Sequence, residues 1–172
     1  MTGLGPPRTV LVVDDEDHVR DALNRVLADA GYSVLTAESG EEALDVLREK
    51  PVQLLISDNN MPGMSGLELF KEARRRYPQM LRIMLTGDVD PELAVRSINE
   101  AEVYRFIRKP WSNADLRTIV QLAFDVIVLE DEKRQLLEIV RRYRAARERG
   151  ETPPSLENEL LLLAEADLLG TP

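Results

Sequence analysis

The sequence predicts a doubly wound α/β fold, in which a five-stranded parallel sheet carries helices on both faces. Short apolar runs alternate five times with amphipathic helical segments, and only a few residues connect one element to the next. Strands that alternate with helices pair in parallel, because each helix returns the chain to the same end of the sheet. After the fifth strand the helical pattern continues well beyond one covering helix, which predicts an extended C-terminal helix.

Five apolar runs are predicted to form the strands. Each run is short, rich in Val, Ile and Leu and bounded by turn residues, as the buried strands of a parallel sheet are. They comprise residues 9–13, 32–37, 52–57, 81–85 and 103–107.

Helical periodicity and capping residues predict a helix after each strand. The first helix carries apolar residues from Val19 to Ala30 and stops at Gly31. The starts of the other four helices are marked by capping residues. Two have the spacing of a capping box, a third has Asp at the N-cap followed by Pro, and a fourth has Ser followed by Asp three residues later. These signals are Ser39 with Glu42, Ser65 with Glu68, Asp90 with Pro91, and Ser112 with Asp115.

Composition excludes several classes of site and partner. The 172 residues include no cysteine and only one histidine, His18, so disulfides, thiolate catalysis, cysteine zinc sites and multi-histidine metal sites are excluded. The net charge of −9 argues against a nucleic-acid surface, which needs clustered Lys and Arg. No apolar run is long enough for a membrane span, and the N-terminus lacks a signal-peptide pattern. We therefore expect a cytoplasmic protein that binds neither nucleic acid nor membrane.

Polar side chains stand at the carboxyl ends of four predicted strands: Asp14 and Asp15, Asp58, Thr86, and Lys109. Open parallel sheets bind their ligands at this edge. Neighbouring carboxylates repel each other, and a hard cation such as Mg²⁺ relieves the repulsion. An ammonium and a hydroxyl can contact phosphate oxygens, while a carboxylate can form an aspartyl phosphate. The strand ends therefore predict a site for phosphate and Mg²⁺.

Four runs of sequence together resemble the receiver domain of bacterial two-component response regulators. They are VLVVDDE (10–16), LLISDNNMPGMSGLEL (54–69), IMLTGD (83–88) and YRFIRKPW (104–111). The resemblance covers residues 8–127 and implies a flavodoxin-like sheet with strand order 2-1-3-4-5. The longer run INEAEVYRFIRKPW also resembles receivers that precede HD-type cyclic-dinucleotide phosphodiesterases.

The resemblance implies that Asp58 is the phospho-acceptor. Asp15 and Asp58 would then bind Mg²⁺ directly, together with the backbone carbonyl of Asn60. Asp14 would act through a bound water, and Lys109 would contact the acyl phosphate.

The same resemblance implies how the signal leaves this site. Thr86 would move toward the phosphate and Phe106 would turn inward behind it, altering the face formed by the fourth helix, fifth strand and fifth helix. Asn60 and Asp88 would tune dephosphorylation, and the Lys109–Pro110 peptide would be cis.

The expected protein is a response regulator in a phosphorelay. A sensor histidine kinase or phosphotransfer protein would phosphorylate it, and it would catalyse only its own phosphotransfer and dephosphorylation. The residues after the receiver are too few for the long helix plus a helix-turn-helix domain, so we expect output through a downstream protein partner. The alternative is a receiver module, or a trans-acting regulator, of a cyclic-dinucleotide phosphodiesterase. A haloacid-dehalogenase-like phosphatase is disfavoured because Asp14 and Asp15 are adjacent and do not form its Asp-x-Asp motif.

Residues 1–8 are predicted to be a flexible leader, 9–128 the receiver domain and 129–150 a helical extension. Heptad spacing gives the last helix an apolar stripe that a parallel homodimer would bury, although the helix could instead fold back on its own domain. Residues 151–172 are predicted to form a Pro-broken linker and a short Leu-rich acidic helix that docks on the coiled coil or on a partner. The predicted dimer seam comprises Ile119, Leu122, Val126, Leu129, Lys133, Leu136 and Val140.

Overall fold

The computed structural model describes residues 8–87, 91–150 and 155. The five strands form one parallel sheet with the order β2-β1-β3-β4-β5, which confirms the predicted topology. The strands are β1 (Thr9–Val13), β2 (Ser33–Ala37), β3 (Leu54–Asp58), β4 (Leu81–Thr86) and β5 (Arg105–Arg108). The helices are α1 (Asp17–Asp29), α2 (Gly40–Glu49), α3 (Gly66–Arg76), α4 (Pro91–Ala101) and α5 (Asn113–Glu148).

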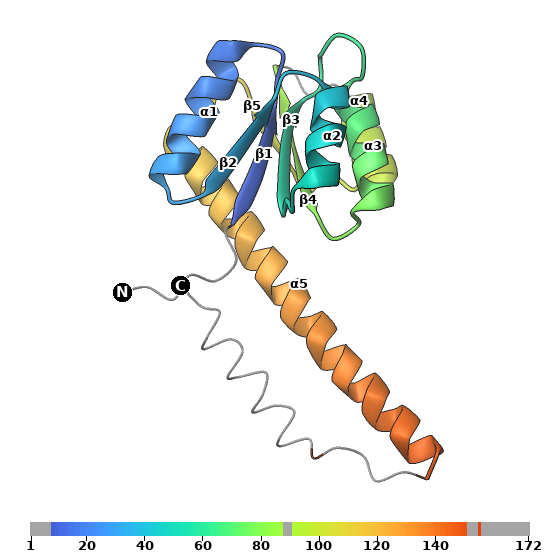
Figure 1. The fold of residues 1–172 in the computed structure, drawn as a ribbon. Helices are drawn as coiled ribbons and strands as arrows, with labels where there is room; N and C mark the ends of the chain where they lie inside the picture. Colours follow the sequence, from blue (N-terminus) through green and yellow to red (C-terminus); the bar gives the residue numbers. More distant parts are fainter. Residues whose placement is uncertain (1–7, 88–90, 151–154, 156–172) are drawn as a thin grey trace. The chain divides into compact units, whose positions relative to one another are not determined.

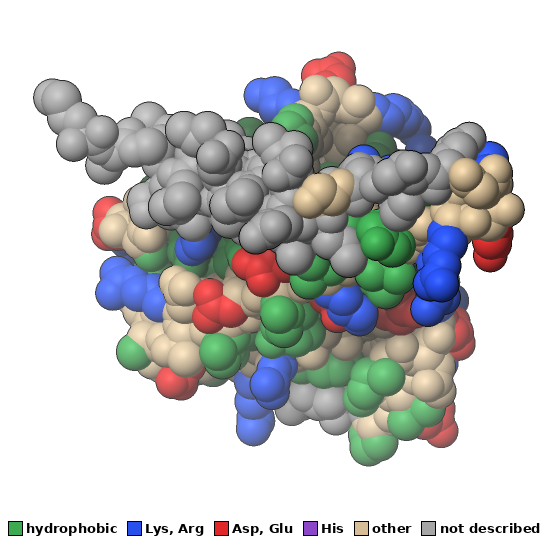
Figure 2. Space-filling view, turned by 90° about the horizontal axis from the view of Figure 1, so that it is seen from below, with side chains coloured by type: hydrophobic (Ala, Val, Ile, Leu, Met, Phe, Trp, Pro, Cys, Tyr) green, Lys and Arg blue, Asp and Glu red, His purple; other side chains and the backbone are tan. Residues whose placement is uncertain are grey.

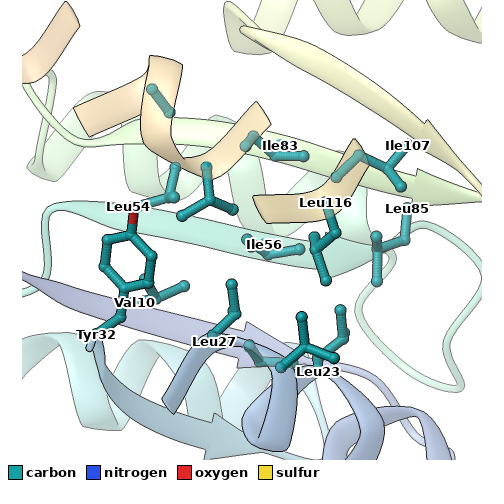
Figure 3. Packing of buried hydrophobic residues seen from close by; sticks show 14 of the residues in the cluster. Val10, Leu23, Leu27, Tyr32, Leu54, Ile56, Ile83, Leu85, Ile107 and Leu116 are labelled. Carbon is teal, nitrogen blue, oxygen red and sulfur yellow. The ribbon is translucent and has the colours of Figure 1, made fainter. Parts of the chain in front are cut away.

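The helices cover both faces of the sheet (Figure 1). On one face, α1 and the first turns of α5 pack against the sheet, with Leu23, Leu27 and Leu116 among their fully buried side chains (Figure 3). On the other face, α2, α3 and α4 cover a second cluster that includes Phe70 and Met84. Burial on both faces explains why the strand sequences are continuously apolar rather than alternating.

Two strand boundaries differ from the predicted ones in a way that bears on the site. Asp58 lies one residue beyond the predicted third strand, but in the structure it is the last residue of β3 and pairs in register with Leu85. β5 begins at Arg105 rather than at Val103, because the Val103 amide donates to the carbonyl of Ser97 in α4.

The predicted capping boxes have different outcomes. At α3, Ser65 and Glu68 form the full reciprocal box. At α2, the Ser39 side chain accepts from the Glu42 amide, but the Glu42 carboxylate accepts from the amide of Glu38. The predicted box at Ser39 is therefore wrong in its second half, because the carboxylate reaches one residue further back along the chain.

α5 is one continuous helix of 36 residues, as the unbroken periodicity predicted. The compact α/β unit comprises Arg8–Ile127, and residues from Val128 onward belong to a separate unit. The predicted cap Asp90, the site residue Asp88 and the tail from 151, apart from Ser155, lie outside the described residues.

Acidic, basic and hydrophobic side chains of the described residues are intermingled on the surface seen in Figure 2. The basic side chains visible there do not gather into one patch, in keeping with a sequence in which 31 acidic residues outnumber 22 basic ones. Within the described ranges, none of the helices has both the length and the apolarity that crossing a bilayer requires.

Candidate functional site

The polar residues predicted to meet at the carboxyl edge of the sheet are carried by neighbouring strand ends. Asp14 directly follows β1, while Asp58 and Thr86 are the last residues of β3 and β4. Lys109 directly follows β5, and its amide donates to the carbonyl of Thr86 at 2.8 Å. Parallel pairing places all these ends on one edge, so residues far apart in sequence share one site.

Lys109 joins the two buried carboxylates of this edge. Its Nζ lies 2.7 Å from Oδ2 of Asp14 and 2.8 Å from Oδ1 of Asp58. Burial acts to lower the pKa of Lys109, but hydrogen bonds and charge from the two carboxylates outweigh it and raise the pKa. The ammonium therefore stays charged and offers a fixed positive centre beside Asp58.

Asp14 is held from several sides. Its Oδ1 accepts from the amide of Glu16 at 3.0 Å, and its backbone carbonyl accepts from the Arg20 guanidinium at 2.6 Å. The side chain is buried, and burial raises the pKa of this carboxyl despite the contact with Lys109. Asp14 is thus a rigidly placed oxygen donor in a poorly solvated position.

Asp58 is positioned by its own loop and by α3. Its Oδ2 accepts from the amide of Asn60 at 2.6 Å. A Cβ at Gly66 would come within 2.2 Å of the Asp58 carbonyl oxygen, so only glycine allows the start of α3 to approach this closely. The first contact holds the carboxylate, and the second holds the backbone that carries it.

Thr86 and Phe106 lie on the same side of the sheet, on the neighbouring strands β4 and β5. Thr86 is buried and pairs in register with Arg108, while Phe106 pairs with Met84 two residues earlier. The Phe106 ring is partly buried and packs against the cluster under α2, α3 and α4. The register therefore places the two predicted switch residues on the same side of β4 and β5, two positions apart along the ladder.

Asp15 and Asn60 lie at the margin of the site, and both are exposed. Within residues 8–87, 91–150 and 155, no three His, Cys, Asp or Glu side chains are grouped so that they could hold one ion. The structure thus brings Asp14 and Asp58 together around Lys109 without adding Asp15 to the group. The predicted ligand role of Asp15 stays a prediction.

Sequence reasoning missed two residues that position this site, Arg20 and Gly66. Arg20 follows Asp14 by six residues on the first turn of α1, a spacing that lets its guanidinium return to the strand end. Gly66 directly follows the capping residue Ser65, and a glycine so early in a helix indicates a close backbone approach. The peptide between Lys109 and Pro110 is cis, as the resemblance implied.

The predicted seam on α5 consists of side chains that the chain leaves at least partly in water. Ile119 and Val126 are partly buried, and the other five members are exposed. Leu129 is 61% exposed and Leu136 is 47% exposed. The apolar stripe is therefore present, and the homodimer remains a prediction.

Comparison with known proteins places the chain among the receivers. Residues 10–121 match the family model of the response regulator receiver domain. The hydrogenase transcriptional regulatory protein HoxA of Cupriavidus necator is 41% identical over 128 residues, which are 74% of this chain and 26% of that protein. The DNA-binding transcriptional regulator NtrC of Klebsiella pneumoniae is 37% identical over 112 residues, 65% of this chain and 24% of that protein. The chain thus spans about a quarter of the length of these curated relatives.

Solved structures agree with this placement. The signal receiver domain of an HD domain-containing protein from Pseudomonas fluorescens Pf-5 has a TM-score of 0.72 and 31% identity, and the match covers 77% of this chain and 97% of that one. The chemotaxis protein CheY4 of Vibrio cholerae has a TM-score of 0.65 and 32% identity, over 69% of this chain and 99% of that one. The fold, the family match and these relatives agree, and the chain belongs to the response regulator receiver domain family.

Proposed function

We propose that Asp58 accepts a phosphoryl group from a phosphohistidine on a sensor histidine kinase or phosphotransfer protein. The observation that carries the proposal is the contact of 2.8 Å between the buried Asp58 carboxylate and the Lys109 ammonium. A receiver domain is a phospho-acceptor switch, and in this chain Asp58 is the buried carboxylate that ends β3 at the ligand-binding edge.

In the transfer step, a carboxylate oxygen of Asp58 attacks the phosphorus atom. The new P–O bond forms as the P–N bond to the donor histidine breaks, and the departing electron pair stays on the imidazole nitrogen. The Lys109 ammonium stabilises negative charge on the phosphoryl oxygens without having to move far. Asp14 keeps Lys109 in place through the contact of 2.7 Å.

The donor atoms at this edge fit Mg²⁺ in kind. Two buried carboxylates share a single ammonium, which leaves an excess negative charge in a poorly solvated place, and Asp15 adds a third carboxylate next in the chain. Mg²⁺ selects oxygen ligands of this type together with water and phosphate. Asp14, Asp15, Asp58 and the backbone carbonyl of Asn60 would hold the ion, which when bound neutralises charge on the transferred group.

Hydrolysis of the acyl phosphate would reset the switch. Asn60 is exposed beside Asp58, where its side chain can admit or orient an attacking water. Asp88 is proposed for the same role from its place two residues after Thr86 in the sequence. The water attacks the phosphorus, the P–O bond to Asp58 breaks, and inorganic phosphate leaves.

The signal would travel through Thr86 and Phe106. A Thr86 hydroxyl drawn toward the phosphoryl group vacates space that the partly buried Phe106 ring can enter, because the two share the same side of β4 and β5. The altered surface is the face of α4, β5 and α5. Bistable packing of this kind converts a small local shift into a change of surface.

We propose protein contacts as the output. The exposed apolar stripe on α5, with Leu129, Leu136 and Val140, suits a homodimer or a downstream partner better than it suits nucleic acid. The net charge of −9 supports the same reading. Because some relatives are named as DNA-binding regulators, binding of this chain to duplex DNA should be measured directly. We expect no binding at low salt.

A second candidate is regulation of a cyclic-dinucleotide phosphodiesterase, as a module or in trans. It is favoured by the likeness to a receiver from an HD domain-containing protein, at 31% identity and a TM-score of 0.72. Binding of the beryllofluoride-treated chain to such an enzyme, with a change in its hydrolysis rate, would distinguish this output from homodimer formation alone.

The proposed acceptor is tested with a small-molecule phosphodonor such as acetyl phosphate. Intact-mass analysis should find one phosphoryl adduct on the chain and none on Asp58→Asn. The matched control is Asp45→Asn, an exposed aspartate on α2 that should leave labelling unchanged. Labelling that survives Asp58→Asn would refute the assignment, and multiple turnover on small phosphoesters would show an enzyme instead of a switch.

A further inference from the structure

The second half of α5 carries a buried face as well as the exposed stripe. Ile139 is only 5% exposed and Ala146 is 6% exposed, whereas Leu136 and Val140 beside them are 47% and 43% exposed. Residues seven apart lie on the same side of an α-helix, so Ile139 and Ala146 form one continuous face. The side chains of an isolated helix would be exposed to water. The burial of Ile139 and Ala146 therefore indicates that this face of α5 packs against another segment.

The surroundings of this face are strongly basic. Residues 139–149, the last turns of α5 and the residue that follows it, include five arginines and a single acidic residue, Glu148. Arg142 follows Ile139 by three positions on the helix, which places it along the border of this face, and Arg149 follows Ala146 by three positions just beyond the end of α5. The face therefore combines an apolar centre with a cationic rim, and its occupant should be apolar and acidic.

We propose that the segment 155–169 of the same chain packs in cis against the Ile139–Ala146 face of α5. This segment holds seven leucines, and residues 151–172 contain five acidic side chains and no basic one. Its chemistry is thus the complement of the arginine-rich rim, and its leucines supply the apolar contact. The inference rests on α5 and on the composition of the segment after it, and it does not depend on the phosphorylation proposed above.

The short connection favours this occupant over one supplied by another molecule. α5 ends at Glu148, Gly150 has a positive φ of 71°, and only residues 151–154, with Pro153 and Pro154, precede the leucine-rich segment. A positive φ just after a helix turns the chain away from the helix axis. A segment tethered by so few residues has an effective concentration on the order of millimolar at a neighbouring face, above that of most free partners.

Docking in cis leaves the predicted dimer seam available. Leu129, Leu136 and Val140 remain exposed, and they lie on a side of α5 next to the Ile139–Ala146 face. The tail would therefore thicken α5 into a helical hairpin while a second copy could still use the seam.

The test uses disulfide trapping in the full chain, which contains no native cysteine. Ala146→Cys is combined in turn with Leu160→Cys, Leu161→Cys, Leu162→Cys and Leu163→Cys, which together sample every side of one helical turn. The matched control series replaces Ala146→Cys by Arg144→Cys, on the opposite side of α5. Mild oxidation is followed by non-reducing electrophoresis and intact mass.

The proposal expects an intramolecular disulfide in at least one Ala146→Cys pair, with the protein still monomeric on the gel, and none in the Arg144→Cys series. Disulfide-linked dimers formed only by the Ala146→Cys pairs would show that a second copy occupies the face, and would overturn docking in cis. Absence of any disulfide, or equal trapping in both series, would overturn it as well.

The charged rim is tested in the Ala146→Cys pair that traps best. Adding Arg142→Glu should slow trapping about two- to fivefold, the range that exposed ion pairs produce. Arg141→Glu, on another side of the helix, is the matched control and should leave the rate unchanged. An equal effect of both substitutions would refute recognition through the rim.

Discussion

The Lys109 ammonium lies 2.7 Å from Oδ2 of Asp14, although the two residues are 95 positions apart in the chain. β3 and β4 lie between the strands that carry them, so the lysine side chain reaches across two strand ends. On its way it contacts Asp58 at 2.8 Å. The Lys109 side chain therefore links the end of β5 to the ends of β1 and β3, and it contacts the candidate acceptor Asp58.

Replacing the lysine tests that role. Lys109→Met should lower the free energy of unfolding by about 1–3 kcal/mol, because Asp14 and Asp58 lose a charged hydrogen-bond donor and face each other. Added Mg²⁺ should restore more stability to the variant than to the parent chain, because the ion replaces the missing cation. Urea unfolding with and without Mg²⁺ measures both effects. Unchanged stability would contradict the bridging role.

Removal of Mg²⁺ should abolish phosphorylation of Asp58. Without the ion, the carboxylates of this edge repel an incoming phosphodianion, and Lys109 alone does not balance them. Labelling by acetyl phosphate is measured in excess chelator and again after Mg²⁺ is restored. Undiminished labelling in chelator would contradict the proposed metal dependence. Recovery of labelling when Mg²⁺ is restored is the internal control.

Gly66→Ala should destabilise the chain by about 1–3 kcal/mol, the usual cost of overpacking. The added methyl group would meet the Asp58 carbonyl oxygen at 2.2 Å, so either α3 or the end of β3 must shift. The rate of phosphoryl labelling should fall together with stability. Gly87→Ala is the stability control, because a Cβ there meets nothing within 4 Å. Equal denaturation midpoints for both variants would refute the close approach.

Arg82 is a buried cation that holds the end of α4. Its guanidinium donates to the carbonyls of Ala101 and Met80 at 2.8 and 2.7 Å, and burial lowers its pKa. Arg82→Met should cost about 1–3 kcal/mol, because two buried carbonyls lose their donors. Arg75→Met, at an exposed position on α3, is the control and should change stability little. Similar urea midpoints for the two variants would show that Arg82 is not an anchor.

The seam on α5 is tested at two leucines of matched exposure. Leu136 lies in the predicted seam and is 47% exposed, while Leu137 lies outside it and is 48% exposed. Leu136→Asp should shift any dimer toward monomer in sedimentation velocity, because it places a charge in an apolar interface. Leu137→Asp should not. A mass unchanged by either substitution would refute the seam.

Local sequence patterns predicted the elements well because they depend on neighbouring residues. The capping box of Ser65 and Glu68 needs only residues three apart, and it forms as predicted. The box at Ser39 forms only in part, since the Glu42 carboxylate had a second amide within reach, that of Glu38. The apolar runs were enough to predict that the strands exist. The exact end of β3 at Asp58 could not be predicted in this way, because it depends on pairing with the neighbouring strand β4.

The sequence by itself determined the alternation of strands and helices and the polar residues that end the strands, because periodicity and composition are local properties. Only the tertiary structure decided that Lys109 bridges Asp14 and Asp58, that Arg82 is buried and that Gly66 touches the Asp58 backbone. These contacts join residues up to 95 positions apart. Their geometry depends on strand order and register, which no short stretch of sequence encodes.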